Sequence, residues 1–198
     1  MRKWRDWDLL VKQYRNFIIL IVLLLVFVGS LSFLIVKNRT NRVKTDKTEK
    51  IAAKEFIGKK LPDFKLIDSN GESFESSQLK NKPTIIIEWA SWCPHCHKML
   101  PIMNNMYKKH KKEINFVFIN ATGSNKGTET RVTAKTYIEK EKFEFPYYYD
   151  DAMAVTRTLK VDSVPTFFYI NNKNIVEDVT VSEMSAKDME NKINQLIN

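Results

Sequence analysis

The chain has 198 residues, enough for one domain and a tail, and 43% of them are hydrophobic, as in ordinary globular proteins. The formal net charge of +9 could suit nucleic acid or an anionic membrane, but basic and acidic residues are interspersed along the whole chain. No platform of aromatic and basic residues for stacking bases is apparent, so binding to nucleic acid is not expected.

The first predicted element is an uncharged apolar run, FIILIVLLLVFVGSLSFLIV, at residues 17–36. A helix of about 20 residues spans about 30 Å, the thickness of the hydrocarbon core of a bilayer. We therefore predict a transmembrane anchor, preceded by a short cytoplasmic segment at residues 1–16. The main alternative is a cleaved signal peptide, whose apolar core is usually about 7 to 15 residues, whereas this run continues past Gly29 and Ser30.

Basic residues flank both ends of this run, so the positive-inside rule does not fix its orientation. The short N-terminal segment favours a cytoplasmic N-terminus, with the C-terminal part outside the cytoplasm. Residues 37–54 carry many charges and few apolar side chains, which is typical of a solvated linker. The folded domain is predicted at residues 55–198, beginning near Glu55.

Short apolar runs alternate with helical patterns from Glu55 onward. Strands are predicted at residues 63–68, 84–90, 114–120, 145–150, 165–171 and 174–181, the first of them in an N-terminal hairpin. Helices are predicted at residues 94–110, 129–142 and 152–159 and from Ser185 to the C-terminus. This order of elements predicts an α/β fold with a mixed sheet.

The two cysteines of the chain, Cys93 and Cys96, stand in the segment EWASWCPHCHKMLP, where a predicted strand ends and a helix begins. A helix N-terminus offers unpaired N–H groups and about half a positive charge, which favour a thiolate over a thiol. Pro94 suits the first helical position, and His95 can place a positive charge beside the sulfur. The arrangement predicts a redox-active dithiol, with Cys93 as nucleophile and Cys96 as resolving thiol.

Three other interpretations of the cysteine pair stay open. A zinc site needs about four ligands, and the chain offers only 3 histidines besides the cysteines, so no metal is expected. A c-type haem would use both sulfurs, with His97 as axial ligand, because the run also spells C-x-x-C-H. A purely structural disulfide between such close neighbours would constrain the unfolded chain little.

Residues 55–198 resemble the thioredoxin-like proteins of the TlpA/ResA type. The resemblance rests on WASWCPHC with Trp92 before the first cysteine, on Pro101 in the helix that follows, and on Val164-Pro165-Thr166, where the family has a cis-proline. Residues 122–142 match the inserted helix of the family. The resemblance implies a thioredoxin fold with an N-terminal hairpin and an inserted helix, preceded here by the transmembrane helix.

The same resemblance implies thiol-disulfide exchange outside the cytoplasm, with no cofactor beyond the redox-active disulfide of Cys93 and Cys96. It also implies that substrates bind at Trp92, Val164 and Pro165, where the backbone before the proline pairs with the substrate as an added strand. The expected partners are cysteine-containing secreted or membrane proteins, a redox partner that recycles the dithiol, and the membrane itself.

Two features depart from the family pattern. Thioredoxin has a buried acid six residues before its first cysteine, and this position is Ile87 here. Glu88, one residue along, is a candidate proton shuttle, but a polar-edge or surface carboxylate is favoured. The dipeptide Pro94-His95 matches the strongly oxidising DsbA proteins and not the ResA-type reductases. Disulfide formation in secreted proteins is therefore favoured, with a ResA-like reductase serving cytochrome c maturation and a c-type haem electron carrier as alternatives.

Overall fold

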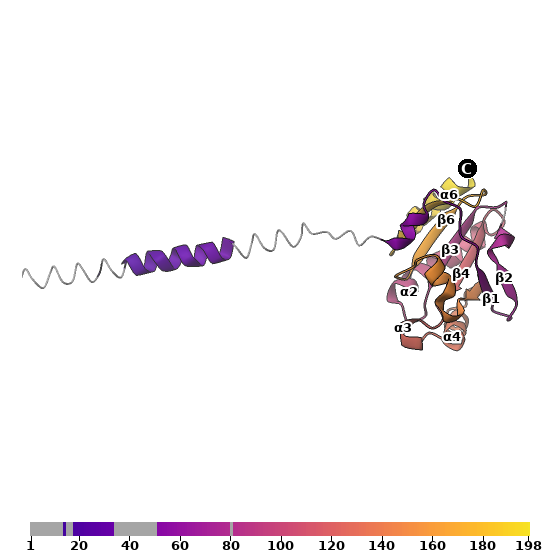
Figure 1. Cartoon of the computed structure of the whole chain (residues 1–198), viewed down its shortest axis with the longest axis horizontal. Helices are drawn as coiled ribbons and strands as arrows, with labels where there is room; N and C mark the ends of the chain where they lie inside the picture. Colours follow the sequence, from indigo (N-terminus) through magenta and orange to yellow (C-terminus); the bar gives the residue numbers. More distant parts are fainter. Residues whose placement is uncertain (1–13, 15–17, 34–50, 80) are drawn as a thin grey trace, which may run out of the picture. The chain divides into compact units, whose positions relative to one another are not determined.

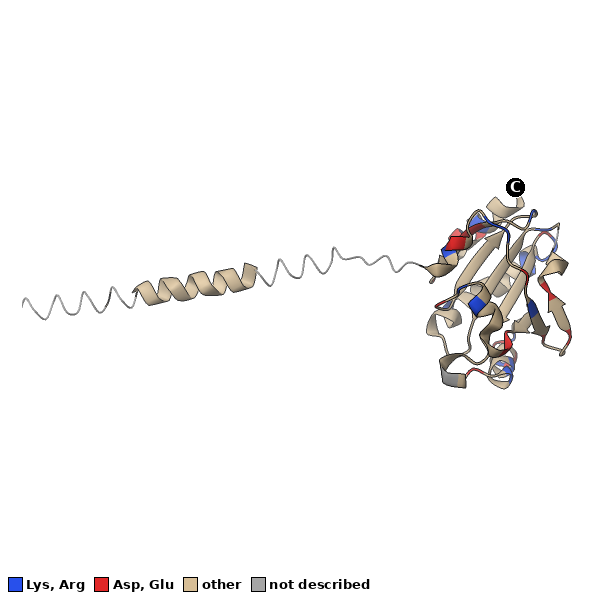
Figure 2. Ribbon diagram, viewed as in Figure 1, with Lys and Arg blue, Asp and Glu red and all other residues tan. Residues whose placement is uncertain are grey.

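The computed structural model describes residues 14, 18–33, 51–79 and 81–198 (Figure 1). The chain forms two units, Met1–Glu49 and Lys50–Asn198, and each is described by itself. In the first unit, residues 18–33 are helical with exposed side chains, and Figure 2 draws this helix without a charged residue. Within the described residues, no helix combines the length and the apolarity that a membrane crossing needs. Phe17 and residues 34–36, which complete the predicted anchor, lie outside the described residues, as do residues 37–50 of the predicted linker.

The second unit is built on one mixed sheet of seven strands in the order β2-β1-β5-β4-β3-β6-β7. The strands are β1 (Lys65–Asp68), β2 (Ser73–Glu75), β3 (Thr84–Trp89), β4 (Asn115–Asn120), β5 (Tyr147–Tyr149), β6 (Thr166–Ile170) and β7 (Val176–Val181). Strands β3, β4 and β5 run parallel, and the other neighbours pair antiparallel. The predicted N-terminal hairpin is β1 with β2, so this prediction is confirmed, and the strands predicted at residues 165–171 and 174–181 pair as β6 with β7.

Helical elements fill the connections between the strands. The α-helices are α2 (Pro94–His110), α3 (Ser124–Gly127), α4 (Arg131–Glu141), α5 (Ala154–Thr158) and α6 (Ala186–Ile197). The 3-10 helices are η1 (Ala52–Phe56), η2 (Ser76–Leu79) and η3 (Asp151–Met153). Helix α3 was not expected from the sequence, and η1 begins before the predicted domain boundary at Glu55, because Ala53 is buried in the core.

The central strand β3 is buried on both faces, as its continuous apolar sequence predicts. Ile85, Ile87 and Trp89 point to the face that α2, α4 and α6 cover. Ile86 points to the opposite face, where η1 and α5 pack. Each fully buried isoleucine stabilises the fold by about 1.5–3 kcal/mol, so β3 is a rigid base for the residues that follow it.

The chain between η1 and β1 runs along the beginning of β7. Gly58 N–H donates to the Val176 carbonyl at 2.8 Å, and Val176 N–H donates to the Lys59 carbonyl at 2.9 Å. Lys60 and Ile175 form an antiparallel bridge beside these bonds. This segment therefore covers part of the outer edge of β7.

Candidate active site

The cysteines lie at the junction of β3 and α2, where the sequence predicts them. Cys93 is the N-cap of α2, with extended backbone angles (φ −84°, ψ 114°), and its sulfur accepts the Cys96 N–H at 3.3 Å. The Cys93 thiol also donates to the Val164 carbonyl at 3.2 Å. Both cysteines are free thiols, and the Cys93 sulfur lies between the helix N-terminus and the Val164 backbone.

The two thiols have opposite electrostatic environments. The pKa of Cys93 is lowered from 9.0 to about 6, chiefly by a hydrogen bond from the Cys96 side chain and, against the cost of burial, by backbone N–H groups of Cys96 and His95 and the charge of His95. The pKa of Cys96 is raised, first by burial and then by its interaction with Cys93. The lowered pKa of Cys93 favours its ionisation to the attacking thiolate, and the raised pKa of Cys96 favours its neutral thiol, the division that attack followed by resolution requires.

Both cysteines are buried. Cys93 is 2% exposed and Cys96 is 0% exposed, so an openly exposed nucleophile is not found. The difference between the two thiols is one of pKa and not of exposure, because the Val164 carbonyl covers the Cys93 sulfur. A substrate sulfur therefore has to approach between α2 and the chain segment that precedes β6.

The residues expected to bind substrate gather around Cys93. The Val164–Pro165 peptide bond is cis, as the sequence predicts, and it leads directly into β6. Trp92 is 43% exposed, and its indole N–H donates to the Ser124 hydroxyl of α3 at 3.1 Å. Helix α3 thereby holds the exposed ring of Trp92 beside the dithiol.

His95 is exposed and has a partner that sequence reasoning missed. Its Nδ1 lies 2.6 Å from Glu183 Oε1, and Lys98 Nζ lies 2.8 Å from the same oxygen. The hydrogen bonds from Lys98 and His95 lower the pKa of Glu183, so this carboxylate is ionised at neutral pH. The positive charge expected of His95 is therefore balanced by Glu183, which comes from the segment after β7.

His97 does not fit the role of a haem ligand. Its Nε2 lies 2.6 Å from the Ser91 carbonyl, so this nitrogen carries a proton and donates. The His97 ring also stacks on Tyr137, with 4.8 Å between the ring centroids. Because the two cysteines are buried as well, the residues of the C-x-x-C-H run are not arranged to hold a c-type haem.

Glu88 is fully buried, which corrects the expectation of a polar-edge or surface carboxylate. The Thr156 hydroxyl lies 2.5 Å from Glu88 Oε1 and 2.7 Å from Asp150 Oδ2, but it has only one hydrogen to donate. Asp150 also accepts the N–H groups of Val155 and Thr156, so the Thr156 hydroxyl is the third donor that converges on this carboxylate. Glu88 is therefore the protonated partner, in agreement with a pKa raised to about 8, mainly by burial.

A second buried carboxylate, Glu129, lies beside the dithiol and was also missed. It comes from the turn between α3 and α4 and is 1% exposed. Its oxygens accept hydrogen bonds from Asn120 Nδ2 at 2.6 Å, from Ser91 N–H at 3.0 Å and from the Ser91 hydroxyl at 2.7 Å. No local pattern marks Glu129, because folding alone brings it next to the turn that carries Cys93.

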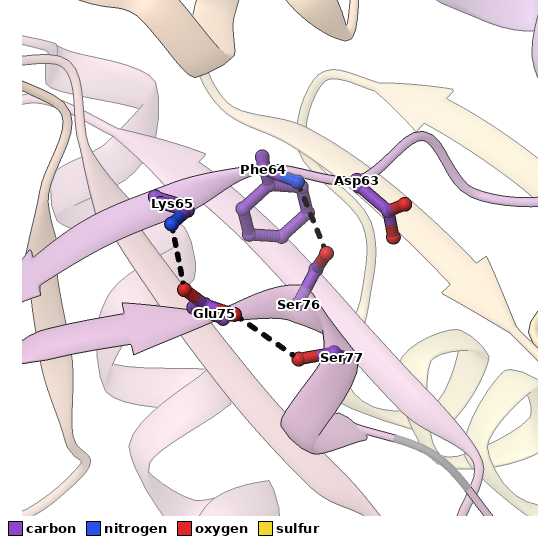
Figure 3. Close-up of a pocket in the computed structure, with 6 residues that line it drawn as sticks. All are labelled: Asp63, Phe64, Lys65, Glu75, Ser76 and Ser77. Carbon is purple, nitrogen blue, oxygen red and sulfur yellow. Dashed lines mark hydrogen bonds and ion pairs between the residues drawn. The ribbon is translucent and has the colours of Figure 1, made fainter.

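The surface pocket drawn in Figure 3 is separate from these residues. It lies at the β1–β2 hairpin, where Lys65 pairs with Glu75 at 2.7 Å and Phe64 N–H donates to the Ser76 hydroxyl at 3.0 Å. None of its lining residues belongs to the dithiol site. Charged residues are scattered over the described part of the folded unit (Figure 2).

Comparisons with known proteins agree with this geometry. The profile of the Redoxin family matches residues 56–197. The thiol-disulfide oxidoreductase ResA of Bacillus subtilis (strain 168) is 30% identical over 146 residues, which are 72% of this chain and 78% of that protein. ResA of Bacillus anthracis is 28% identical over 141 residues, which are 71% of this chain and 78% of the relative.

Solved structures show the same fold. The crystal structure of StoA from Bacillus subtilis superimposes with a TM-score of 0.58 at 25% identity, covering 67% of this chain and 96% of StoA. A thiol:disulfide interchange protein of the thioredoxin family from Chlorobium tepidum TLS gives a TM-score of 0.60 at 23% identity, covering 70% of this chain and 96% of the other. The predicted thioredoxin-like α/β fold is confirmed.

Proposed function

The chain belongs to the Redoxin family and is a thiol-disulfide oxidoreductase of the ResA/DsbE type, and from this premise we propose that it reduces disulfides in proteins outside the cytoplasm. Its substrates are cysteine-containing secreted or membrane proteins, and a separate redox partner returns the dithiol to its reduced state. The exchange needs no cofactor beyond the Cys93–Cys96 couple.

The contact between the Cys93 thiol and the Val164 carbonyl carries this proposal. A substrate that pairs with the backbone before Pro165 as an added strand would bring its disulfide to the Cys93 sulfur. The Cys93 thiolate attacks, a mixed disulfide forms, and Cys96 then attacks the Cys93 sulfur and releases the reduced substrate. Trp92, exposed beside Cys93, offers apolar surface to the same substrate.

The size of the thiolate stabilisation favours reduction over oxidation. Thioredoxin, with a nucleophile of pKa about 7, has a potential of about −270 mV, whereas DsbA, with a pKa of about 3.5, has about −120 mV. With a Cys93 pKa of about 6, thiolate ionisation stabilises the reduced form at pH 7 about fivefold more than in thioredoxin, which raises the potential by roughly 20 mV. The same calculation for DsbA gives a rise of roughly 95 mV, so the potential expected for this protein is much nearer to that of thioredoxin.

Formation of disulfides in secreted proteins is the second candidate. The dipeptide Pro94-His95 and the lowered pKa of Cys93 favour it, since both make the disulfide form a stronger oxidant. The pairing of His95 with Glu183 argues against a large effect of the dipeptide. Maturation of cytochromes c, which also needs reduced cysteines in an exported protein, is one specific task that a reductant of this kind could perform.

The redox state of the two cysteines in growing cells tests the direction. Alkylation of free thiols during rapid acid quenching, followed by gel-shift analysis, should find Cys93 and Cys96 mostly reduced in a reductase. A cysteine pair that is mostly disulfide-bonded, with secreted proteins losing their disulfides in a deletion strain, would instead identify the oxidase.

Attachment to the membrane through residues 17–36, with the folded domain outside, is part of the proposal. The length and apolarity of this sequence support it, and an extracytoplasmic domain fits a role in disulfide exchange. Protease added to intact protoplasts should digest the domain. A domain that survives until the cells are lysed would rule out the external location.

A further inference from the structure

The resolving step leaves one proton without an assigned acceptor. Cys96 must lose its proton before it can attack the mixed disulfide, and burial raises the pKa of this thiol. Thioredoxin carries an acid at the position of Ile87, but here that side chain is apolar and fully buried. Another group near Cys96 has to take the proton if the step is to be fast.

Three titratable groups among the described residues influence or face Cys96: Cys93 on the same helix, Tyr137 on α4, and Glu129 before α4. Cys93 is bonded to the substrate when Cys96 attacks, so it cannot accept a proton. Tyr137, whose pKa is raised to about 12, mainly by burial, remains a neutral phenol at pH 7. Only the carboxylate of Glu129 is then left as a base.

Glu88 does not compete for this role. It points to the opposite face of β3 from Ile87, contacts Thr156 beside α5, and is already protonated at neutral pH. The sheet therefore lies between Glu88 and the two thiols, which belong to the core on the side of the sheet that α2 and α4 cover.

The contacts of Glu129 hold its charge at the turn that carries the dithiol. Three hydrogen bonds, two of them from Ser91, fix the carboxylate in place. In the same turn the Cys93 N–H donates to the Ala90 carbonyl at 3.2 Å, so the residues that bind Glu129 also position the dithiol. The charge of Glu129 contributes to the raised pKa of Cys96.

We propose that Glu129 accepts the proton of Cys96 during the resolving step and so replaces the acid that is absent at Ile87. The S–H bond of Cys96 breaks as the proton passes to the Glu129 carboxylate, directly or through one water molecule. The Cys96 thiolate attacks the Cys93 sulfur, the Cys93–Cys96 bond forms, and the substrate sulfur leaves as a thiolate with the electron pair of the broken disulfide. Glu129 afterwards returns the proton to solvent.

The inference rests on the dithiol exchange of the proposed function, and one assay observes both steps separately. The reduced full-length protein is mixed in a stopped-flow instrument with one equivalent of 5,5′-dithiobis(2-nitrobenzoate). Attack by Cys93 releases the first coloured thiolate, and attack by Cys96 releases the second. Loss of the first phase would count against the dithiol exchange of the proposed function. Slowing of the second phase alone tests the role of Glu129, whichever direction the protein catalyses in the cell.

The variant Glu129→Gln should leave the first phase within about twofold and slow the second by roughly 10²-fold at pH 7, the usual loss when a general base is removed. Glu129→Asp, which keeps the carboxylate, should recover part of the rate.

Two control variants separate proton transfer from a structural role of Glu129. Ser91→Ala removes one hydrogen bond to the carboxylate but keeps its charge, so the second phase should stay within about threefold. Glu88→Gln changes the carboxyl on the other face and should leave both phases intact. Equal slowing of both phases in Glu129→Gln, or a second phase within about threefold of the unmodified protein, would overturn the proposal.

Discussion

Replacing His95 by glutamine should change the redox behaviour only slightly, although the dipeptide suggested a decisive role. Among the interactions that lower the pKa of Cys93, the charge of His95 contributes least, and the backbone N–H of residue 95 remains in the variant. The His95 ring is also paired with the Glu183 carboxylate, at 2.6 Å between Nδ1 and Oε1. We therefore expect the pKa of Cys93 to rise from about 6 by less than about one unit, which is less than about 1.4 kcal/mol.

The corresponding change in potential follows from the fraction of thiolate. If the Cys93 pKa rose to about 7, ionisation would stabilise the reduced form at pH 7 about fivefold less, and the reduction potential would fall by roughly 20 mV. Below the pKa, reduction takes up two protons and the potential falls by roughly 60 mV per pH unit; above it, one proton is taken up and the slope is roughly 30 mV. The change of slope should lie near pH 6 and move upward in the variant.

Equilibration with glutathione between about pH 5 and pH 9 measures both quantities. His97→Gln is the matched control, since this histidine is also on α2 but does not contribute to the pKa of Cys93. A potential at pH 7 that falls by about 30 mV in His95→Gln, which is the whole of the thiolate stabilisation, or a change of slope that moves by two or more pH units, would refute the ranking of these contacts.

Three further predictions concern the cysteines and the core. Cys96→Ala should accumulate mixed disulfides with substrates on non-reducing gels, whereas Cys93→Ala should not; trapping by Cys93→Ala alone would reverse the roles. The lowered pKa of Cys93 should make the reduced protein more stable as pH rises from about 6 to about 9, and this gain should be absent from urea unfolding of Cys93→Ser. The raised pKa of Glu88 acts in the opposite sense, costing stability as pH rises from 4.5 to about 8. Glu88→Gln should therefore raise the unfolding free energy at pH 7 by on the order of 3 kcal/mol, and an unchanged or lower value would contradict the protonated state of Glu88.

The sequence predicts those parts of the fold that depend on local pattern. Helix α2 spans Pro94–His110, the predicted residues, because its N-cap, the proline at its first position and its apolar spacing are all local signals. The cores of the strands are likewise predicted, with ends that differ by a few residues at most. Helix α3 was missed because its four residues, Ser124–Gly127, are too few to show a periodic pattern.

The contacts that define the electrostatics of the site could not be predicted in this way. Glu183 meets His95 across 88 residues, Glu88 meets Thr156 across 68, and Glu129 meets Ser91 across 38. Each contact depends on how the sheet brings distant segments together, and no spacing within the chain encodes it. The expectation for Glu88 failed although the apolar run of β3 indicates a strand covered on both faces, because nothing in that run shows that the distant Thr156 provides a buried partner for the carboxyl group.

The segment that lies along the beginning of β7 bears on how the protein avoids self-association. An uncovered edge strand offers free N–H and carbonyl groups to another chain and so invites intermolecular pairing and aggregation. The bonds of Gly58 and Lys59 to Val176 occupy part of that edge. A shortened protein that starts at Leu61, close to the first residue of the hairpin, would keep the dithiol but leave this edge open. Recombinant forms of the domain should therefore begin no later than Ile51 if they are to remain monomeric at high concentration.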